Sequence, residues 1–322
     1  MSSNPIIIIG GEPQSIFLEI FLKAIKQLKK RKKPIILISS KDILKKNIKK
    51  FNKNIEINEL DNNYSNLKLK SINLVNIDYK NFSFSNRKIT SRSNLYIKNS
   101  FVKAIDILKK KNCSGLINGP ISKKYFLKGK FNGITEFLAK KTNSKNPVML
   151  IYNKNLSVSP LTTHMPISKV SKDVKKMDII NKIVKINDFY LKVLNEKPRI
   201  AVTGLNPHCE SFDNENKEKK EIMPAIKYLK KKKINARGPY AADTIFLKEN
   251  VKKFDLIFGM YHDQVLGPMK TLFGFNAINI TLGLPFIRIS PDHGPNVKML
   301  GKNKSNPNSI IESIRFIEKH AV

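Results

Sequence analysis

Three of the five histidines in the 322-residue chain lie where they could form a metal site. His164, His208 and His262 each follow an expected strand, and they are far apart in sequence. In open α/β sheets, ligands bind outside the carboxyl ends of strands, where distant residues converge. This spacing excludes a zinc finger, whose ligands are local, and suits an open catalytic site with three protein ligands. The alternative is three unrelated loop or core histidines, each satisfied by hydrogen bonds.

Other polar side chains near these histidines also suggest chemistry. Asp243 precedes a helical pattern, so it either caps that helix or acts as a carboxylate near the metal. Arg288 lies in an apolar strand-like run, where its guanidinium suits a bound carboxylate or phosphate; a structural ion pair is the alternative. Lys270 and Asn279 fall in the same stretch of sequence. Lys123, after another expected strand, either reaches a bound anion or is a solvated lysine.

The elements that must position these residues alternate along the chain. Expected strands cover residues 6–9, 34–39, 114–117, 148–152, 199–203 and 255–258. Expected helices cover residues 15–30, 97–111, 173–194, a stretch from about 215, and 307–320. This alternation favours βαβ units, and therefore an α/β fold with a largely parallel sheet flanked by helices. The length allows two domains or one elaborate α/β unit.

Composition excludes several classes of protein. The formal charge is +35, but only seven of the 60 basic residues are arginine. Nucleic-acid readers favour arginine and gather charge on one face, whereas these lysines are spread throughout, so we expect no specific nucleic-acid partner. No apolar run approaches the length that spans a bilayer, and the first residues read as a strand rather than a signal. Two cysteines offer no disulfide framework, which suits the cytoplasm.

No common nucleotide-binding motif is present. The chain has no Walker loop, and Gly10-Gly11-Glu12-Pro13 after the first strand lacks the Gly-x-Gly-x-x-Gly pattern. The residues alone therefore indicate a metal site with anion-binding side chains in an α/β fold, and they identify no cofactor-binding residue.

The order of the polar segments resembles the 4-hydroxythreonine-4-phosphate dehydrogenase family of vitamin B6 (pyridoxal phosphate) biosynthesis. The strings that carry the resemblance are TTH ending at His164, GLNPH ending at His208, ADT around Asp243, YHDQ around His262, and NITLGLPFIR from Asn279 to Arg288. The resemblance covers most of the chain and is strongest from residue 115 to residue 294.

The resemblance implies an isocitrate/isopropylmalate-dehydrogenase-like fold, in which two α/β domains enclose a cleft. Residues 1–125 plus about 290–322 would form the first domain. Residues from about 126 to 289 would form the second, with the dimer interface and most of the metal and substrate residues. The family also implies a homodimer whose site is shared by both subunits, so that dimerisation becomes a condition of activity.

By the same resemblance, the three histidines match the metal ligands, for Zn, Mg, Mn or Co. The positions that match substrate-binding residues are Thr135, Lys270, Asn279 and Arg288. Lys270, Asp243 or a metal-bound water would accept the proton. The implied reaction is oxidation of 4-phosphooxy-L-threonine with NAD, or NADP, followed by decarboxylation to 3-amino-2-oxopropyl phosphate and CO2.

Four departures from the family motivate alternatives. Ile134 stands where the family usually has a substrate-contacting histidine, and residues 14–18 replace a glycine-rich run. The loop after His208 lacks the usual glycines, and Pro295-Asn296 replaces small or hydroxyl residues. The first alternative is a dehydrogenase of the same fold that acts on another phosphorylated hydroxy acid, such as a four-carbon aldonate phosphate. The second is a catalytically degenerate homologue.

Overall fold

The chain divides into two compact units. Unit 1 comprises Met1–Lys140 and Pro285–Val322, and unit 2 comprises Lys141–Leu284. The computed structural model describes residues 4–80, 82–122, 125–126, 131, 133–210, 216–274, 276–291 and 293–321. The observed limits differ from the predicted ones near residues 125 and 290, and they place both Thr135 and Arg288 in unit 1.

Unit 1 is built on a parallel sheet with the strand order β3-β4-β2-β1-β5-β12. Its strands are β1 (Ile6–Ile9), β2 (Ile35–Ser39), β3 (Ile57–Glu59), β4 (Ile72–Asn76), β5 (Gly115–Asn118) and β12 (Arg288–Pro291). The four isoleucines of β1 are fully buried, as a central parallel strand covered on both faces requires.

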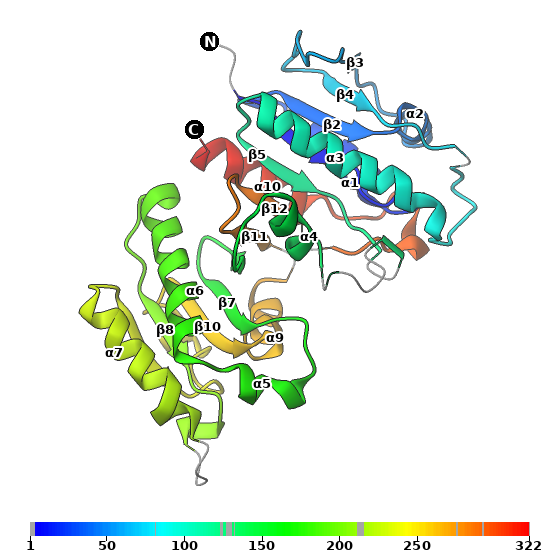
Figure 1. Cartoon of the computed structure of the whole chain (residues 1–322). Coiled ribbons are helices and arrows are strands. Elements are labelled where there is room, and N and C mark those ends of the chain that lie inside the picture. The colour runs from blue at the N-terminus through cyan, green and yellow to red at the C-terminus, as the bar shows by residue number, and fades with distance from the viewer. Residues whose placement is uncertain are drawn as a thin grey trace. The chain divides into compact units, whose positions relative to one another are not determined.

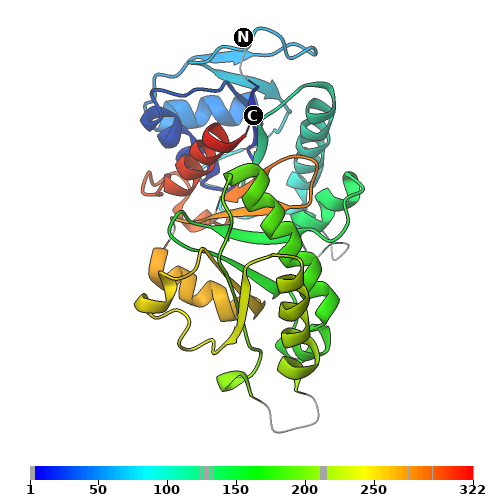
Figure 2. The same cartoon turned by 90° about the vertical axis from the view of Figure 1, so that its left-hand side faces the viewer.

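Helices cover both faces of this sheet. They are α1 (Phe17–Gln27), α2 (Lys41–Lys50), α3 (Asn94–Lys110), α4 (Ile134–Lys141) and α10 (Asn308–His320), with 3-10 turns at Ser91–Ser93 and Val297–Met299. Helices α1 and α10 pack against each other on one face, and α3 packs on β1 and β2 from the other (Figures 1 and 2).

Unit 2 has a mixed sheet with the strand order β11-β6-β7-β10-β8-β9. Its strands are β6 (Val148–Tyr152), β7 (Ser157–Thr162), β8 (Ile200–Thr203), β9 (Ala236–Tyr240), β10 (Leu256–Tyr261) and β11 (Ile278–Leu282). Strands β7, β10, β8 and β9 are parallel, whereas β6 is antiparallel to both β7 and β11. The four parallel strands therefore end at one edge of the sheet.

The helices of unit 2 are α5 (Ile167–Asp173), α6 (Lys176–Phe189), α7 (Met223–Lys231), α8 (Lys248–Val251) and α9 (His262–Phe273), with π-helical turns at Tyr190–Leu194 and Glu218–Ile222 and a 3-10 turn at Pro207–Cys209. Helices α6 and α7 pack against each other, and α9 packs on β7 and β10 (Figure 1). Beneath α9, an apolar core includes Val158, Ile257 and Val265.

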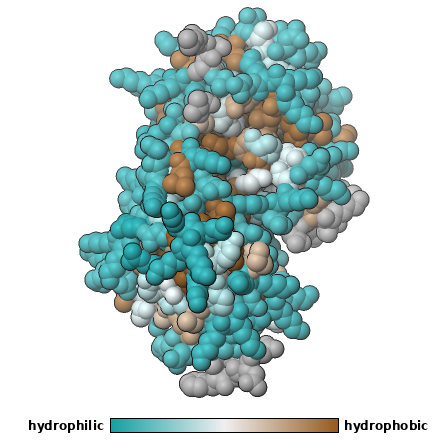
Figure 3. All heavy atoms as spheres, turned by 60° about the vertical axis from the view of Figure 1, so that its left-hand side comes forward, coloured by the Kyte–Doolittle hydropathy of each residue, from teal (hydrophilic) through white to brown (hydrophobic). Residues whose placement is uncertain are grey.

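The predicted α/β class, with parallel strands separated by helices, is confirmed. Strands β3, β4, β7, β9 and β11 were not among the expected strand ranges, and for β7 and β9 the sequence shows a reason. Each contains a proline, Pro160 in β7 and Pro239 in β9, and a proline counts against a strand interior in a sequence pattern. Among the described residues, no helix is both long and apolar enough to cross a membrane. Hydrophilic residues predominate on the face shown in Figure 3, in agreement with lysines as solvated side chains.

Candidate active site

The three histidines follow three neighbouring parallel strands of unit 2. Strand β10 lies between β7 and β8 and is parallel to both. His164 comes after β7, His208 after β8, and His262 directly after β10 as the first residue of α9. Because parallel strands end at the same edge, the sheet brings the three turns to one edge of unit 2, where α/β proteins bind ligands.

His164 and His262 form a close pair. Their ring centroids are 6.0 Å apart, and their ring planes are inclined by 41°. An imidazole nitrogen binds Zn at about 2.0–2.1 Å, which puts a ring centre roughly 3 Å from the ion, so two rings at this separation can flank one ion. His262 Nδ1 also lies 3.2 Å from Asp263 Oδ1, a carboxylate that can fix the imidazole tautomer. The separation and donor chemistry of the pair therefore fit a divalent metal.

His208 is not gathered with the other two. It lies exposed in the 3-10 turn Pro207–Cys209 with a φ of 54°, in the left-handed region that non-glycine residues seldom adopt. Within the described parts of the chain, no group of three His, Cys, Asp or Glu side chains lies close enough to hold a metal. The structure thus pairs His164 with His262, and the three-histidine site stays a prediction.

A buried carboxylate fixes the loop that carries His208. Glu218 is almost fully buried, and its Oε1 accepts hydrogen bonds from the backbone N–H groups of Leu205 and Asn206, both at 2.8 Å. Its Oε2 accepts a third, from Asn206 Nδ2 at 3.0 Å. Charge-assisted hydrogen bonds of this kind hold a loop in one conformation. Glu218 was not predicted from sequence, because it lies in a lysine-rich stretch that resembles an ordinary solvated helix.

A second buried side chain ties the strand ends together. Gln264 Oε1 accepts hydrogen bonds from Thr203 Oγ1 at 2.8 Å and from the Met260 N–H at 2.7 Å. Its Nε2 donates to the Gly204 carbonyl oxygen at 2.8 Å. Thr162 Oγ1 donates to the Met260 carbonyl oxygen, also at 2.8 Å. The network joins the ends of β7, β8 and β10, and therefore positions the three histidine turns relative to one another. Sequence analysis gave Gln264 no role.

Asp243 lies at the same edge of unit 2. It follows β9, the parallel neighbour of β8, and its side chain is exposed. The next helix, α8, begins at Lys248 with Leu247 as its N-cap, so the capping interpretation of Asp243 is wrong. Burial raises the pKa of the Cys209 thiol, and the carboxylates of Glu218 and Asp243 add to that effect. Asp243 is therefore close enough to the His208 turn to act on it electrostatically.

Lys270 and Asn279 belong to unit 2 as well. Lys270 is an exposed residue of α9, two helical turns beyond His262. Partial burial lowers the pKa of its ammonium, which is the direction that a proton acceptor requires. Asn279 is a partly exposed residue of β11, opposite Ile151 of the antiparallel strand β6.

Arg288 and Thr135 meet in unit 1. Arg288, only 4% exposed on β12, donates from Nε to Asn118 Oδ1 at 2.7 Å and from Nη1 to Thr135 Oγ1 at 3.4 Å. Burial lowers the pKa of the guanidinium to about 10, while the Glu136 carboxylate opposes that shift. The group therefore stays charged at neutral pH. The structure brings together two sequence-predicted substrate residues and adds Asn118, which the sequence analysis had not assigned.

Two of the four departures from the family pattern, Ile134 and residues 14–18, fall on buried positions, whereas Asn296 is exposed and the loop after His208 lies partly outside the described residues. Ile134, at the start of α4, is 6% exposed and belongs to the hydrophobic core of unit 1. Phe17, within the replaced glycine-rich run, is fully buried with its ring centroid 6.0 Å from that of His293. Burial lowers the pKa of His293. Lys123, the possible anion-binding lysine, lies outside the described residues.

Together these features define a two-unit α/β protein with a histidine pair at the ends of parallel strands and a buried arginine. The sequence profile of the family described as "Pyridoxal phosphate biosynthetic protein PdxA" matches residues 30–317. A 4-hydroxythreonine-4-phosphate dehydrogenase from Sulfurihydrogenibium sp. is 39% identical over 312 residues, which is 95% of either chain. One from Aquifex aeolicus is 34% identical over 319 residues, 96% of this chain and 95% of that one. The chain therefore belongs to the PdxA family.

Solved structures agree with this placement. The crystal structure of 4-hydroxythreonine-4-phosphate dehydrogenase from Klebsiella pneumoniae has a TM-score of 0.81 at 25% identity, and the match covers 98% of both chains. The isocitrate dehydrogenase from Methylococcus capsulatus has a TM-score of 0.51 at 10% identity, over 98% of this chain and 85% of that one. The second likeness concerns the fold alone, and the predicted isocitrate-dehydrogenase-like fold is confirmed.

Proposed function

We propose that this protein oxidises 4-phosphooxy-L-threonine with NAD and decarboxylates the product to 3-amino-2-oxopropyl phosphate and CO2. The observation that carries the proposal is the His164–His262 pair at the carboxyl edge of the parallel strands, with ring centroids 6.0 Å apart. Two relatives that match about 95% of the chain carry the name of this dehydrogenase, which supports the same substrate here.

The proposal includes a divalent metal. His164 and His262 would hold it, with His208 as the third ligand, and the bound ion would supply Lewis-acid polarisation of the substrate oxygens. The chain's own contribution is preorganisation. The Gln264 and Glu218 hydrogen bonds hold the three histidine turns, so little freedom has to be lost when the ligands close.

Substrate binding falls to Arg288 and Thr135. A guanidinium binds the oxygens of a carboxylate or phosphate through paired N–H groups, and Asn118 fixes its orientation from the Nε side. An anionic end held in this way presents the neighbouring C–H bond in one direction only. Lys270 would accept the hydroxyl proton at Nζ, because partial burial favours its neutral form. NAD would supply the hydride acceptor.

We also propose that the protein acts as a homodimer with a shared site. His208 lies exposed in its turn, apart from the His164–His262 pair, which leaves it available to a site that is completed on assembly. Mixing inactive His262→Ala chains with inactive Arg288→Ala chains tests this. If one site draws on both subunits, the mixture is expected to regain activity, because some mixed dimers then contain one intact site. A mixture that stays inactive would contradict the shared site.

The test of the activity is direct. The purified protein is loaded with Zn, Mg, Mn or Co and given 4-phosphooxy-L-threonine with NAD or NADP. Equal amounts of reduced cofactor and CO2 are expected, with NAD preferred. Absence of both products with every metal would contradict the proposal.

A second substrate class is favoured by one observation, the buried apolar side chain of Ile134 where the family usually has histidine. An isoleucine donates no hydrogen bond. A substrate that needs no hydrogen bond at this position, such as a four-carbon aldonate phosphate, would therefore lose less binding energy than one that needs it. Parallel assays with that compound separate the two. If kcat/KM is higher for the aldonate phosphate than for 4-phosphooxy-L-threonine, the aldonate phosphate is the better candidate substrate.

A further inference from the structure

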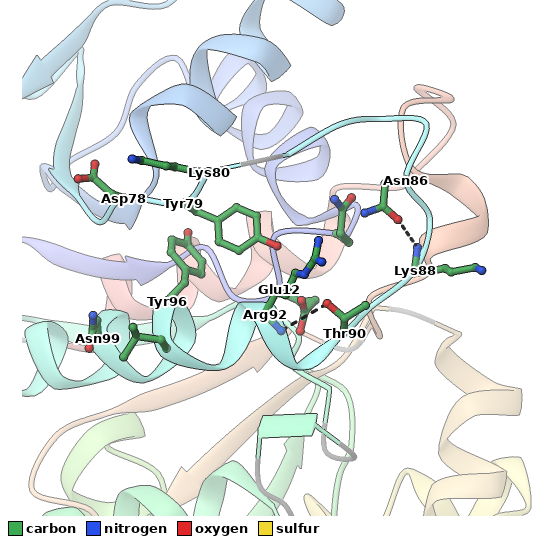
Figure 4. Close-up of a pocket in the computed structure, with 12 residues that line it drawn as sticks. Glu12, Asp78, Tyr79, Lys80, Asn86, Lys88, Thr90, Arg92, Tyr96 and Asn99 are labelled. Atoms are coloured by element: carbon green, nitrogen blue, oxygen red, sulfur yellow. Dashed lines mark hydrogen bonds between the residues drawn. The ribbon is translucent and has the colours of Figure 1, made fainter.

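Unit 1 contains a polar pocket of about 310 Å³, and none of the residues that line it is assigned above to the metal or to the substrate. It lies beyond the carboxyl ends of β1 and β4, and it is closed on another side by the start of α3 (Figure 4). Glu12 and Gln14 enter it from the loop after β1, Tyr79 from the segment after β4, and Arg92 from the 3-10 turn before α3.

Glu12 and Gln14 are each only 2% exposed. Both carboxylate oxygens of Glu12 and both polar atoms of the Gln14 amide lack a hydrogen-bond partner among the described residues. Burial raises the pKa of the Glu12 carboxyl group, and the nearby Ser93 hydroxyl and Ser122 backbone oppose that shift without lying in hydrogen-bonding geometry. Buried polar groups are almost always paired, because leaving them unpaired costs free energy. Four unpaired atoms on one wall of a pocket therefore call for a ligand.

The backbone holds Glu12 in this position. Gly11 has a φ of 70°, and a Cβ there would lie 2.5 Å from the Pro120 carbonyl oxygen. That oxygen accepts a hydrogen bond from the Glu12 N–H at 2.8 Å. Ser15 Oγ donates to the Glu12 carbonyl oxygen at 2.7 Å, so the loop is fixed on both sides of the carboxylate.

The rest of the pocket indicates what the ligand carries. Tyr79 projects its ring toward Glu12 and Arg92, and it packs against Tyr96 with centroids 5.3 Å apart and planes inclined by 60° (Figure 4). Burial raises the pKa of the Tyr79 phenol, and the nearby Glu12 carboxylate adds to it. The cations Lys80, Lys88 and Arg92 line the same pocket. The pocket thus combines two adjacent carboxylate oxygens, a flat aromatic ring and positive charge.

These three features match the three parts of a nucleotide. A carboxylate with two adjacent acceptor oxygens is the group that binds the neighbouring hydroxyls of ribose in dinucleotide-binding proteins. An aromatic ring provides a face or edge for a base. Lysine and arginine bind phosphate. A simple anion would leave the buried carboxylate unpaired, and a simple cation would meet three lysine or arginine side chains.

We propose that this pocket binds a ribonucleotide, with its ribose hydroxyls on Glu12 and Gln14, its base beside Tyr79 and its phosphate toward Arg92. The inference rests on the proposed function in one respect. The nicotinamide dinucleotide is the ribonucleotide that the proposed dehydrogenase would use, so the pocket would be its subsite. A free mononucleotide that regulates the enzyme would satisfy the same chemistry.

The ligand side is tested first, because it needs no variant. AMP and 2′,3′-dideoxy-AMP are titrated into the full-length protein by calorimetry. AMP is expected to bind at least about tenfold more tightly, since two hydroxyl hydrogen bonds to a buried carboxylate are lost in the dideoxy compound. Equal affinities, or no binding of AMP, would overturn the proposal.

The protein side uses Glu12→Gln and Gln14→Ala, with Glu312→Gln as the matched control. Glu312 is a surface residue on α10 that pairs with Arg315, away from the pocket residues in sequence. Both pocket variants are expected to weaken AMP binding by about tenfold or more, and the control by less than twofold. A cooperative urea-unfolding transition like that of the wild type shows that each variant is folded. Unchanged AMP affinity in folded variants would overturn the proposal.

NAD distinguishes the two sources of the nucleotide. If the KM for NAD rises in both variants, the pocket belongs to the cofactor. If the KM for NAD is unchanged while the affinity for AMP falls, the pocket belongs to a regulatory mononucleotide. The two proposals also fail separately. If the wild-type protein binds AMP through Glu12 but does not turn over 4-phosphooxy-L-threonine, only the proposed function is contradicted. If it turns over the substrate fully but does not bind AMP, only the proposed nucleotide site is contradicted.

Discussion

The Nε of Arg288 donates to Asn118 Oδ1 at 2.7 Å, across two neighbouring parallel strands of unit 1. The amide of Asn118 also donates to the Gly119 carbonyl oxygen at 2.9 Å, which fixes its own rotamer. The carboxyl end of β5 thus sets the plane of a buried guanidinium before any substrate arrives. An anion-binding group held in advance loses little side-chain entropy on binding.

Replacing Arg288 by lysine is expected to raise the KM for 4-phosphooxy-L-threonine by at least about tenfold, because a lysine cannot make paired hydrogen bonds to an anion. Arg315→Lys on the exposed face of α10 is the matched control and is expected to change KM by less than twofold. Steady-state kinetics of both proteins measure this. An unchanged KM in Arg288→Lys would show that the guanidinium is structural only.

Replacing Gln264 by leucine leaves the Met260 N–H, the Thr203 hydroxyl and the Gly204 carbonyl unpaired in a buried place. The free energy of unfolding is expected to fall by about 2–4 kcal/mol, from typical costs of about 1–3 kcal/mol for each buried unpaired group. Metal affinity should fall with it, because the histidine turns lose their common support. Urea unfolding and metal titration measure the two effects. Gln27→Leu, at the exposed end of α1, provides the control, and equal stability of the two variants would contradict the account.

Glu12 makes stability depend on pH. Burial raises the pKa of its carboxyl group from 4.5 to about 6, so the folded protein binds this proton more tightly than the unfolded chain. The resulting stabilisation is complete below pH 4.5 and is lost as pH rises through about 6. Glu12→Gln is therefore expected to raise the free energy of unfolding at pH 8 by about 2 kcal/mol while weakening AMP binding. Denaturant unfolding at pH 4 and pH 8 tests this, and a variant less stable than wild type at pH 8 would contradict it.

The metal assignment predicts a graded pattern of metal loss. His164→Ala and His262→Ala are each expected to lower the affinity for Zn by at least about a hundredfold, because the loss of a ligand exceeds the 10–100-fold loss seen for outer-shell partners. His208→Ala should do the same if its turn closes on the pair. His320→Ala, at the end of α10, is the control. Equal metal content in all four variants after dialysis would contradict the assignment of a metal site to these histidines.

Residue patterns predicted the α/β class and half of the twelve described strands, because isoleucine-rich runs such as Ile6–Ile9 are buried on both faces. They missed β7 and β9, whose prolines count against strands in a local window. The residue type of Asp243 and its place before a helical pattern also suggested an N-cap, although the helix that follows begins only at Lys248. Helix starts are set by backbone contacts that a residue pattern does not contain.

His208 and His262 could be found from sequence because each follows an expected strand, whereas β7, the strand before His164, was not expected. The side chains that support the three histidine turns could not be found from sequence. Glu218 accepts hydrogen bonds from two residues about a dozen positions away, and Gln264 reaches Gly204 across 60 residues. The Glu12 pocket depends on a segment near Tyr79 that has no clear periodicity. Long-range hydrogen bonds and unpaired buried atoms become visible only when the chain is folded.

The central claim is tested most directly by turnover of 4-phosphooxy-L-threonine with NAD, measured side by side for the metal-loaded protein and for His262→Ala. The account predicts one NADH and one CO2 for each substrate consumed by the protein, and a loss of at least about a hundredfold in kcat/KM for the variant. No product from the protein, or equal rates from both, would contradict it.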